Sequence, residues 1–164
     1  TEHLIKNGCK KIAYLVINKT LSIGKTRMNG YVDALTKYSI TFDNDLVIDC
    51  SNDYQENHKI LKKAFVKLQP DGVFAAVERL AFATYYAAYD LNINIPRQLK
   101  VISFSSLEIA PLLNPSLTTI TQPATELGVL AANTLFNILK TGEVSEEIQY
   151  VLESKLIERD STIG

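Results

Sequence analysis

The 164-residue sequence has no tryptophan, and it contains only two cysteines, two histidines and seven glycines. Cys9 and Cys50 lie far apart without metal-ligand spacing, so we expect reduced structural thiols, with one disulfide left open as an alternative. The scattered glycines form no phosphate-binding loop, and the sequence has no G-x-S-x-G, P-loop, G-x-G-x-x-G or H-E-x-x-H motif. His3 and His58 fall in predicted helices. The sequence therefore predicts no metal, no cofactor and a protein that is not an enzyme.

A charge excess and a long apolar run are also missing. The formal net charge is −1, which gives no electrostatic footprint for nucleic acid or an anionic membrane. No apolar run approaches the roughly 18 residues that a membrane span needs, and no signal peptide is visible. We therefore expect a cytoplasmic protein without a membrane partner. Because the first residue is Thr1 and the first segment has a helical pattern, we interpret the sequence as an N-terminally truncated fragment.

Short apolar runs alternate with amphipathic segments along the chain. This alternation is typical of βαβ units and predicts an α/β fold with a doubly wound parallel sheet. The strands are expected at 10–17, 45–50, 70–77, 99–105, 116–123 and 147–159. The helices are expected at 1–7, 25–39, 54–68, 78–93 and 125–142, with an irregular link at 106–115.

The segment NPSLTTITQP, residues 114–123, combines two prolines with a β-branched run that favours extended backbone. Pro115 is expected to end the irregular link, and Pro123 to end the strand just before a helix. Thr125 is the predicted N-cap of that helix and Gly142 its C′ residue. We interpret the segment as a hinge strand that passes between two lobes.

A doubly wound sheet binds ligands beyond the carboxyl ends of its strands. The residues that follow the predicted strands are 18–22, 51–54, 77–78 and 105–106, and each set contains polar groups. Since loops are polar in most proteins, this pattern alone hardly separates a binding domain from a scaffold.

Several segments together resemble the effector-binding domain of the lactose/galactose-repressor (LacI/GalR) family of transcription regulators. EHLIKNGCKKIAYL is similar to the family's EHLIxxGHxxIAxI, and TRMNGYVDAL to its xRxxGYxxAL. PDGVFAAVERLAFATYYAAYDLNINIPRQLKVISFSS resembles PDAxFAxNDxxAxGAxxAxxxxGxxIPxDxxVxGFDD. NPSLTTITQPATELGVLAANTLFNIL resembles PPLTTVxQPxxxLGxxAxxxLxxxL, and LIERDST resembles LVxRxST.

The resemblance implies a periplasmic-binding-protein fold (type I): two α/β lobes, three crossover strands and a small ligand between the lobes. It implies a partial N-lobe at 1–17, a complete C-lobe at 18–121, an N-lobe helix at 122–147 and a final C-lobe strand and tail at 148–164. The third crossing is then expected near Ile148. The implied partners are a sugar or nucleoside-like effector, a second copy in a homodimer, and DNA only through a domain that precedes this chain.

Six residues are carried over as candidate ligand contacts. Arg27 matches the family's ligand-binding arginine, or is a surface residue of an amphipathic helix. Glu78 takes the place of the family's Asp, where it accepts a ligand hydroxyl or is simply an acidic first-turn residue. Ser105 replaces an Asp of the family's DD pair, which puts a standard sugar ligand in doubt. The others are Gln122 in the hinge, with backbone pairing as the alternative, and Ser22 and Tyr54 at the cleft edge.

Tyr54 could stack on a sugar ring, or pack on its own lobe at the entry of a helix. Phe82 and Tyr86 lie four residues apart on one helix face, and the resemblance places them, roughly with Leu112, at a dimer interface. Their alternatives are core packing or an exposed face for another self-association.

Two rival functions remain at this point. One is an extracytoplasmic sugar-binding protein of an uptake system, which has the same fold. The other is a hydrolase or transferase on a doubly wound sheet, which the missing motifs disfavour.

Overall fold

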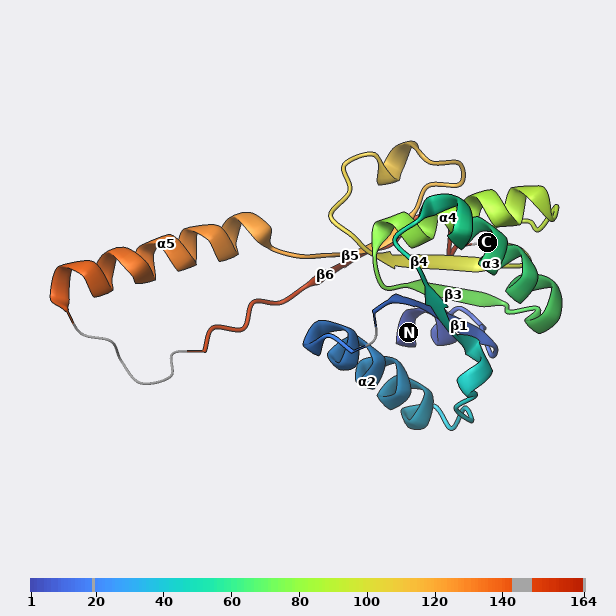
Figure 1. Ribbon diagram of the computed structural model, residues 1–164, viewed down its shortest axis with the longest axis horizontal. Helices are drawn as coiled ribbons and strands as arrows, with labels where there is room; N and C mark the ends of the chain where they lie inside the picture. The colour runs from blue at the N-terminus through green and yellow to red at the C-terminus, as the bar shows by residue number, and fades with distance from the viewer. Residues whose placement is uncertain (19, 143–148, 164) are drawn as a thin grey trace.

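The computed structural model describes residues 1–18, 20–142 and 149–163. Its centre is a six-stranded sheet in the order β2-β1-β3-β4-β5-β6 (Figure 1). The first five of these are parallel, and β6 runs antiparallel to β5. The strands are β1 (Ile12–Ile17), β2 (Val47–Cys50), β3 (Gly72–Ala75), β4 (Lys100–Phe104), β5 (Thr118–Thr121) and β6 (Lys155–Ile157). The α/β class and the mostly parallel sheet predicted from the sequence are confirmed.

Helices cover both faces of the sheet, because side chains of its strands alternate between two apolar layers. Tyr14, Phe74 and Ile102 face one layer, and Leu15 and Val73 face the other. The first layer is closed by α1 and α2, and the second by α3 and α4. The helices are α1 (Glu2–Lys6), α2 (Ser22–Lys37), α3 (Tyr54–Leu68), α4 (Glu78–Asp90) and α5 (Ala124–Thr141), with short 3-10 turns at Asn44–Leu46 and Ala110–Leu112.

The position of β1 corrects the predicted lobe boundaries. The sequence-based division placed residues 1–17 in a different lobe from residues 18–121. In the structure, β1 lies between β2 and β3 and pairs with both in parallel register. Leu4 of α1 is fully buried in the same apolar layer as Tyr14. Residues 1–17 therefore share the core of the residues that follow them, because an isolated apolar run does not reveal which sheet it will join.

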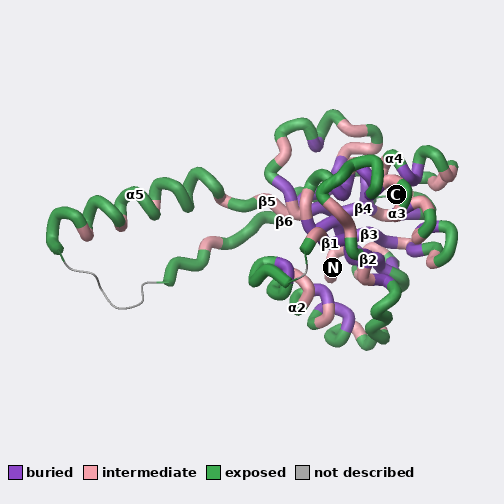
Figure 2. Tube along the Cα trace, viewed as in Figure 1, coloured by how far each residue is buried: buried purple, intermediate pink, exposed green. Residues whose placement is uncertain are grey.

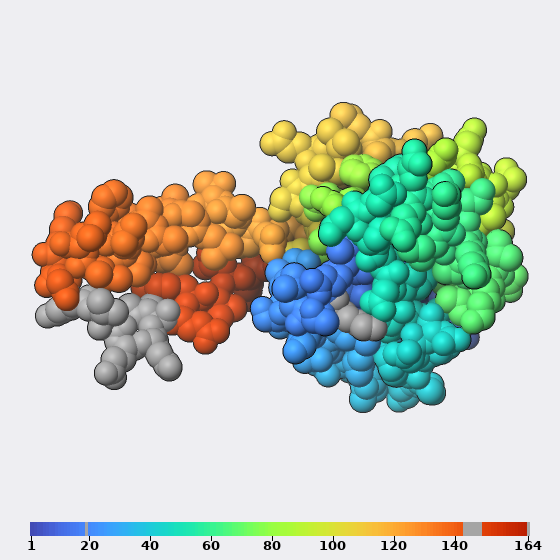
Figure 3. Space-filling model, viewed as in Figure 1, coloured from blue at the N-terminus to red at the C-terminus, as the bar shows by residue number. Residues whose placement is uncertain are grey.

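A long arm leaves the body at the β5–β6 edge and carries α5 (Figures 1 and 3). No residue of α5 is buried, and the helix is exposed along nearly its whole length (Figure 2). Its exposed side chains include large apolar ones, namely Leu127, Val129, Leu135, Phe136 and Leu139. The extended segment before α5 and the helix itself were predicted. The crossing predicted near Ile148 lies outside the described residues.

The ends of α5 test two capping predictions. Gly142 has a φ of 69° and adopts the left-handed conformation that ends the helix, as predicted. The prediction that Thr125 is the N-cap is wrong, because the helix already begins at Ala124 and Pro123 occupies the cap position. A proline in the cap position offers no side-chain acceptor, and no side-chain capping bond forms.

The last described segment is anchored to the body by hydroxyl groups. The Ser161 hydroxyl donates to the Val101 carbonyl oxygen at 2.6 Å and accepts from the Thr118 N–H at 2.8 Å. The Arg159 guanidinium donates to the Leu117 carbonyl oxygen at 2.6 Å. Ser161 and Thr162 are fully buried. These bonds tie the chain after β6 back to β4 and β5.

Both cysteines are free thiols, as predicted. Burial raises the pKa of Cys9 to about 12, with the Asp71 carboxylate adding to the effect. Burial, with Asp49, also raises the pKa of Cys50 to about 12. Since only the thiolate reacts and each pKa unit changes its fraction about tenfold, the folded protein should react with a disulfide reagent at pH 8 at least about a hundredfold more slowly than the unfolded chain. Labelling with and without guanidinium chloride measures this, and equal rates would contradict it.

Candidate functional site

A pocket of about 300 Å³ opens at the carboxyl edge of the sheet, between the ends of β1 and β3. After β1 the chain forms β2 on one side of β1, and it then forms β3 on the other side of β1. The pocket therefore lies at the point where the strand order reverses. Open α/β sheets bind ligands at such points. The pocket is lined by Val16, Ile17, Leu21, Ile23, Gly24, Arg27, Asn52, Ala76, Val77, Glu78 and Arg79.

Arg27 comes from the second turn of α2 and is held in place from two sides. One guanidinium nitrogen donates to the Ala76 carbonyl oxygen at 2.8 Å, just beyond the end of β3. The guanidinium carbon lies 4.2 Å from the centre of the Phe104 ring, at the end of β4. Burial lowers the pKa of Arg27, and the nearby Tyr14 and Glu78 act in the opposite direction. The side chain stays a cation, fixed at the edge of the sheet with donors to spare.

The start of α4 supplies the other charged groups of the pocket. Glu78 and Arg79 are its first two residues, and both are exposed. An Arg79 guanidinium nitrogen donates to the Asn52 side-chain oxygen at 3.4 Å, which links α4 to the loop before α3. Of the predicted ligand contacts, Arg27 and Glu78 both line this pocket. Arg79 and Asn52 were missed, although Asn52 lies in a loop already recognised as following a strand and Arg79 adjoins Glu78.

Three of the other predicted contacts do not line this pocket. Ser105 is buried, and its hydroxyl accepts the Leu107 N–H at 3.0 Å, so it shapes the turn after β4. Gln122 forms a hydrogen bond through its backbone, because its N–H donates to the Ser106 hydroxyl at 3.1 Å. Ser22 is exposed at the start of α2.

Tyr54 joins an aromatic row instead of the pocket. Its ring stacks on that of Tyr86, with centroids 6.3 Å apart and the planes at 12°. On α3, the His58 ring also stacks on Tyr86 at 4.0 Å, and its Nε2 lies 3.1 Å from the Asp90 carboxylate. The structure thus places Tyr54 beside Tyr86, which was predicted at a dimer interface. Tyr54 packs on its own lobe, which was the alternative to stacking on a sugar ring.

The three residues predicted at that interface differ in exposure. Phe82 is half-buried on α4, Tyr86 is 46% exposed, and Leu112 is 81% exposed. The link that carries Leu112 is tied to α4 by a bond of 2.8 Å from the Tyr85 hydroxyl to the Pro115 carbonyl oxygen. Tyr86 and Leu112 are therefore available for contact with another molecule.

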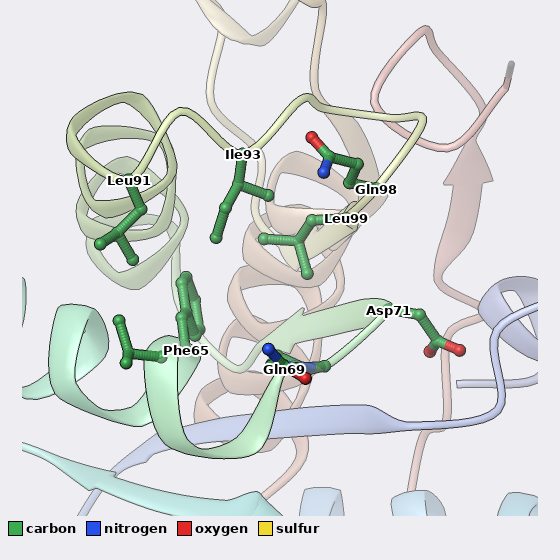
Figure 4. Close-up of a pocket in the computed structure, with 9 residues that line it drawn as sticks. Phe65, Gln69, Asp71, Leu91, Ile93, Gln98 and Leu99 are labelled. Atoms are coloured by element: carbon green, nitrogen blue, oxygen red, sulfur yellow. The ribbon is translucent and has the colours of Figure 1, made fainter.

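A second cavity, of about 410 Å³, lies at the opposite edge of the sheet (Figure 4). Phe65, Leu91 and Leu99 form its apolar wall between the ends of α3 and α4. Its one acid, Asp71, sits apart from these side chains in Figure 4 and already accepts two backbone N–H groups at 2.8 Å. This cavity presents little free polar chemistry, so the smaller pocket at the carboxyl edge is the candidate site.

The described part of the chain contains neither a cluster of metal-ligating side chains nor a membrane-spanning helix. Across residues 1–18, 20–142 and 149–163, no three His, Cys, Asp or Glu side chains gather where they could hold a metal ion. None of the helices described there is long and apolar enough to cross a membrane.

Comparison with known proteins identifies relatives over nearly the whole chain. The family of periplasmic binding protein-like domains matches residues 1–162. The ribose operon repressor of Halalkalibacterium halodurans is 26% identical over 166 residues, which cover 100% of this chain and 49% of that protein. The HTH-type transcriptional regulator RegA of Clostridium saccharobutylicum is 31% identical over 170 residues, covering 99% of this chain and 49% of that protein. The chain thus spans about half the length of these curated relatives.

Solved structures agree with this assignment. A LacI family transcriptional regulator from Enterococcus faecium, solved with bound ribose, superposes with a TM-score of 0.84 at 26% sequence identity. The match covers 98% of this chain and 59% of that one. This chain therefore belongs to the periplasmic binding protein-like domain family, and its relatives in that family are LacI-type transcriptional regulators.

Proposed function

We propose that this chain is the effector-binding and dimerisation domain of a cytoplasmic LacI/GalR-type transcriptional regulator, and that it catalyses no reaction. The observation that carries the proposal is the position of Arg27, a fixed cation in the pocket where the strand order reverses. The regulators among its relatives favour this function over that of an uptake protein. DNA is bound by a domain outside this chain, because the chain carries no basic excess, with a net charge of −1.

The effector is a small polar molecule, sugar-like or nucleoside-like. The Arg27 guanidinium uses one nitrogen for the Ala76 carbonyl oxygen, and its remaining N–H groups suit two adjacent oxygens of a ligand. Val16, Ile17, Leu21 and Ile23 supply an apolar wall for the body of such a molecule. The relative solved with ribose supports a ligand of this size.

The effector acts by changing how two lobes close on it. Since β5 is parallel to β1 and β3, the chain leaves the sheet toward α5 at the same edge that carries the pocket. We assign the sheet and α1 to α4 to one lobe, and α5 to a second lobe that covers its apolar side chains. Closure of the lobes on the ligand then shifts the population of the dimer that binds DNA.

Substitution of Arg27 tests the effector site. A screen of sugars and nucleosides against the full-length protein by thermal shift first identifies a ligand. Arg27→Ala should then weaken its binding about tenfold to a hundredfold, because a hydrogen bond to a charged group contributes about 1.5–3 kcal/mol. Titration calorimetry measures the change. Binding of the protein to DNA from upstream of its own gene should respond to the ligand in the parent, and in Arg27→Ala only at about tenfold to a hundredfold higher ligand concentration.

Two variants on the same helix serve as controls. Lys25 is exposed and does not line the pocket, so Lys25→Ala should leave affinity unchanged. Arg27→Lys keeps the charge but loses the planar fork, and it should recover only part of the affinity. The proposed site is wrong if Arg27→Ala binds the ligand as tightly as the parent does.

A further inference from the structure

The pocket at the carboxyl edge holds more positive than negative charge. Arg27 and Arg79 line it, and Glu78 is the acid among the lining residues. Within the described residues, no carboxylate lies within ion-pair distance, 4.0 Å, of either guanidinium. Ala76 and Phe104 hold Arg27 in place, whereas Arg79 is exposed and donates one bond of 3.4 Å to Asn52. Arginines without a carboxylate partner are suited to bind an anion that comes from outside the chain.

Two helix N-termini add to this positive field. Both α2 and α4 begin at the pocket, with Leu21 and Val77 in their cap positions and no side-chain capping bond. In contrast, the neighbouring α3 is capped by Asp53, whose carboxylate accepts the Glu56 N–H at 2.7 Å. First-turn N–H groups that lack a side-chain acceptor, at the positive end of a helix dipole, bind anionic oxygens.

We infer that the effector carries an anionic group, a phosphate or a carboxylate on a sugar-like body, which Arg79 and the N-terminus of α4 bind. This inference rests on the proposed effector site and names the ligand class for it. Arg27 then contacts the body of the ligand from the other side of the pocket, because Ala76 and Phe104 hold its guanidinium there. A neutral sugar of the same shape leaves Arg79 without a partner other than Asn52.

Glu78 sets the selectivity of this site. It is exposed and adjoins Arg79, so its carboxylate repels the same anion that Arg79 attracts. Removal of its charge by Glu78→Gln should therefore tighten binding of an anion, while Arg79→Gln should weaken it. Opposite effects at neighbouring residues separate a local anion site from a general change in stability.

The test uses the full-length protein and sets of probes that share a sugar ring and differ in the group on its terminal carbon, which is a neutral hydroxymethyl, a phosphate ester or a carboxylate. Ribose, ribose 5-phosphate and riburonate form one set, and glucose, glucose 6-phosphate and glucuronate form another. Calorimetry at constant ionic strength should show that the phosphate or the carboxylate member of a set binds at least about tenfold more tightly than its neutral sugar, as expected for a charge-assisted hydrogen bond. The two anionic members distinguish a phosphosugar from a sugar acid.

Three variants then locate the anion. Arg79→Gln should reduce the preference for the anionic member about tenfold or more, and Glu78→Gln should increase it. Arg97→Gln, at an exposed arginine on the turn before β4 at the opposite edge of the sheet, changes net charge equally and should leave the preference intact.

The outcomes separate this inference from the proposed function. A neutral sugar that binds as tightly as its anionic partners overturns the inference and leaves the effector function standing. An anion preference that survives Arg79→Gln, or that falls equally in Arg97→Gln, also overturns it. If no member of either set binds, and the wider screen finds no ligand, both this inference and the proposed function fail.

Discussion

In hydrogen-exchange measurements on this chain, the amides of α5 should exchange about a thousandfold or more faster than those of α3 and α4, given the usual stability of a protein core. An isolated helix of this length is only marginally stable in water, because most helical stability comes from the packing of an apolar face. No residue of α5 is buried, whereas Leu61 and Phe65 of α3 and Leu80 of α4 are within 2% of complete burial. Mass spectrometry of peptides from the two regions measures the contrast.

The same measurement on the full-length protein supplies the control. If α5 belongs to a second lobe, its amides should there be protected to a degree similar to those of α4. Measurements at several concentrations of the chain test whether α5 packs against another copy. In that case, the protection of the α5 amides should decrease when the chain is diluted. Strong, concentration-independent protection of α5 in the chain alone would contradict its assignment to another lobe.

The order of helices and strands could be predicted because apolar spacing is a local property. The β1 run, Ile12–Ile17, is apolar on both sides because both faces of the sheet are covered, and its sequence reveals that directly. Its place between β2 and β3 could not be predicted from that run, because strand order depends on contacts distant in sequence. The lobe boundary at Ile17 was wrong for this reason.

Only part of the candidate site could be predicted. Arg27 was found because a motif marks it, and Glu78 because it follows a strand and precedes a helix. Arg79 carries no comparable signal, since an arginine in the first turn of a helix is usually only a solvated side chain. Ser105 also follows a strand, but its hydroxyl turns back to the Leu107 N–H, and sequence does not reveal which way a loop side chain points.

Leu112→Asp should weaken the proposed homodimer at least about a hundredfold, because a symmetric interface buries the substituted residue twice and desolvating a carboxylate is costly. Leu112 is 81% exposed, and Tyr86 on the adjoining α4 is 46% exposed, so the free chain leaves both in water. Tyr54 stacks on Tyr86 and extends this surface. Large apolar side chains that are exposed often mark a contact site for another molecule, and for this reason we propose that Leu112 and Tyr86 contribute to the homodimer interface.

The substitution is informative because Leu112 is exposed, so a loss of dimer in Leu112→Asp cannot be explained by a failure of the variant to fold. A side chain that contributes little to the core leaves the thermal midpoint of a monomer nearly unchanged when it is replaced. Val66→Asp provides the matched control, since Val66 is 64% exposed on α3 and lines the cavity at the opposite edge of the sheet. Sedimentation of the full-length protein should therefore show monomers for Leu112→Asp and dimers for the parent and Val66→Asp. A dimer that survives Leu112→Asp, or dissociates equally in Val66→Asp, would remove this surface from the interface.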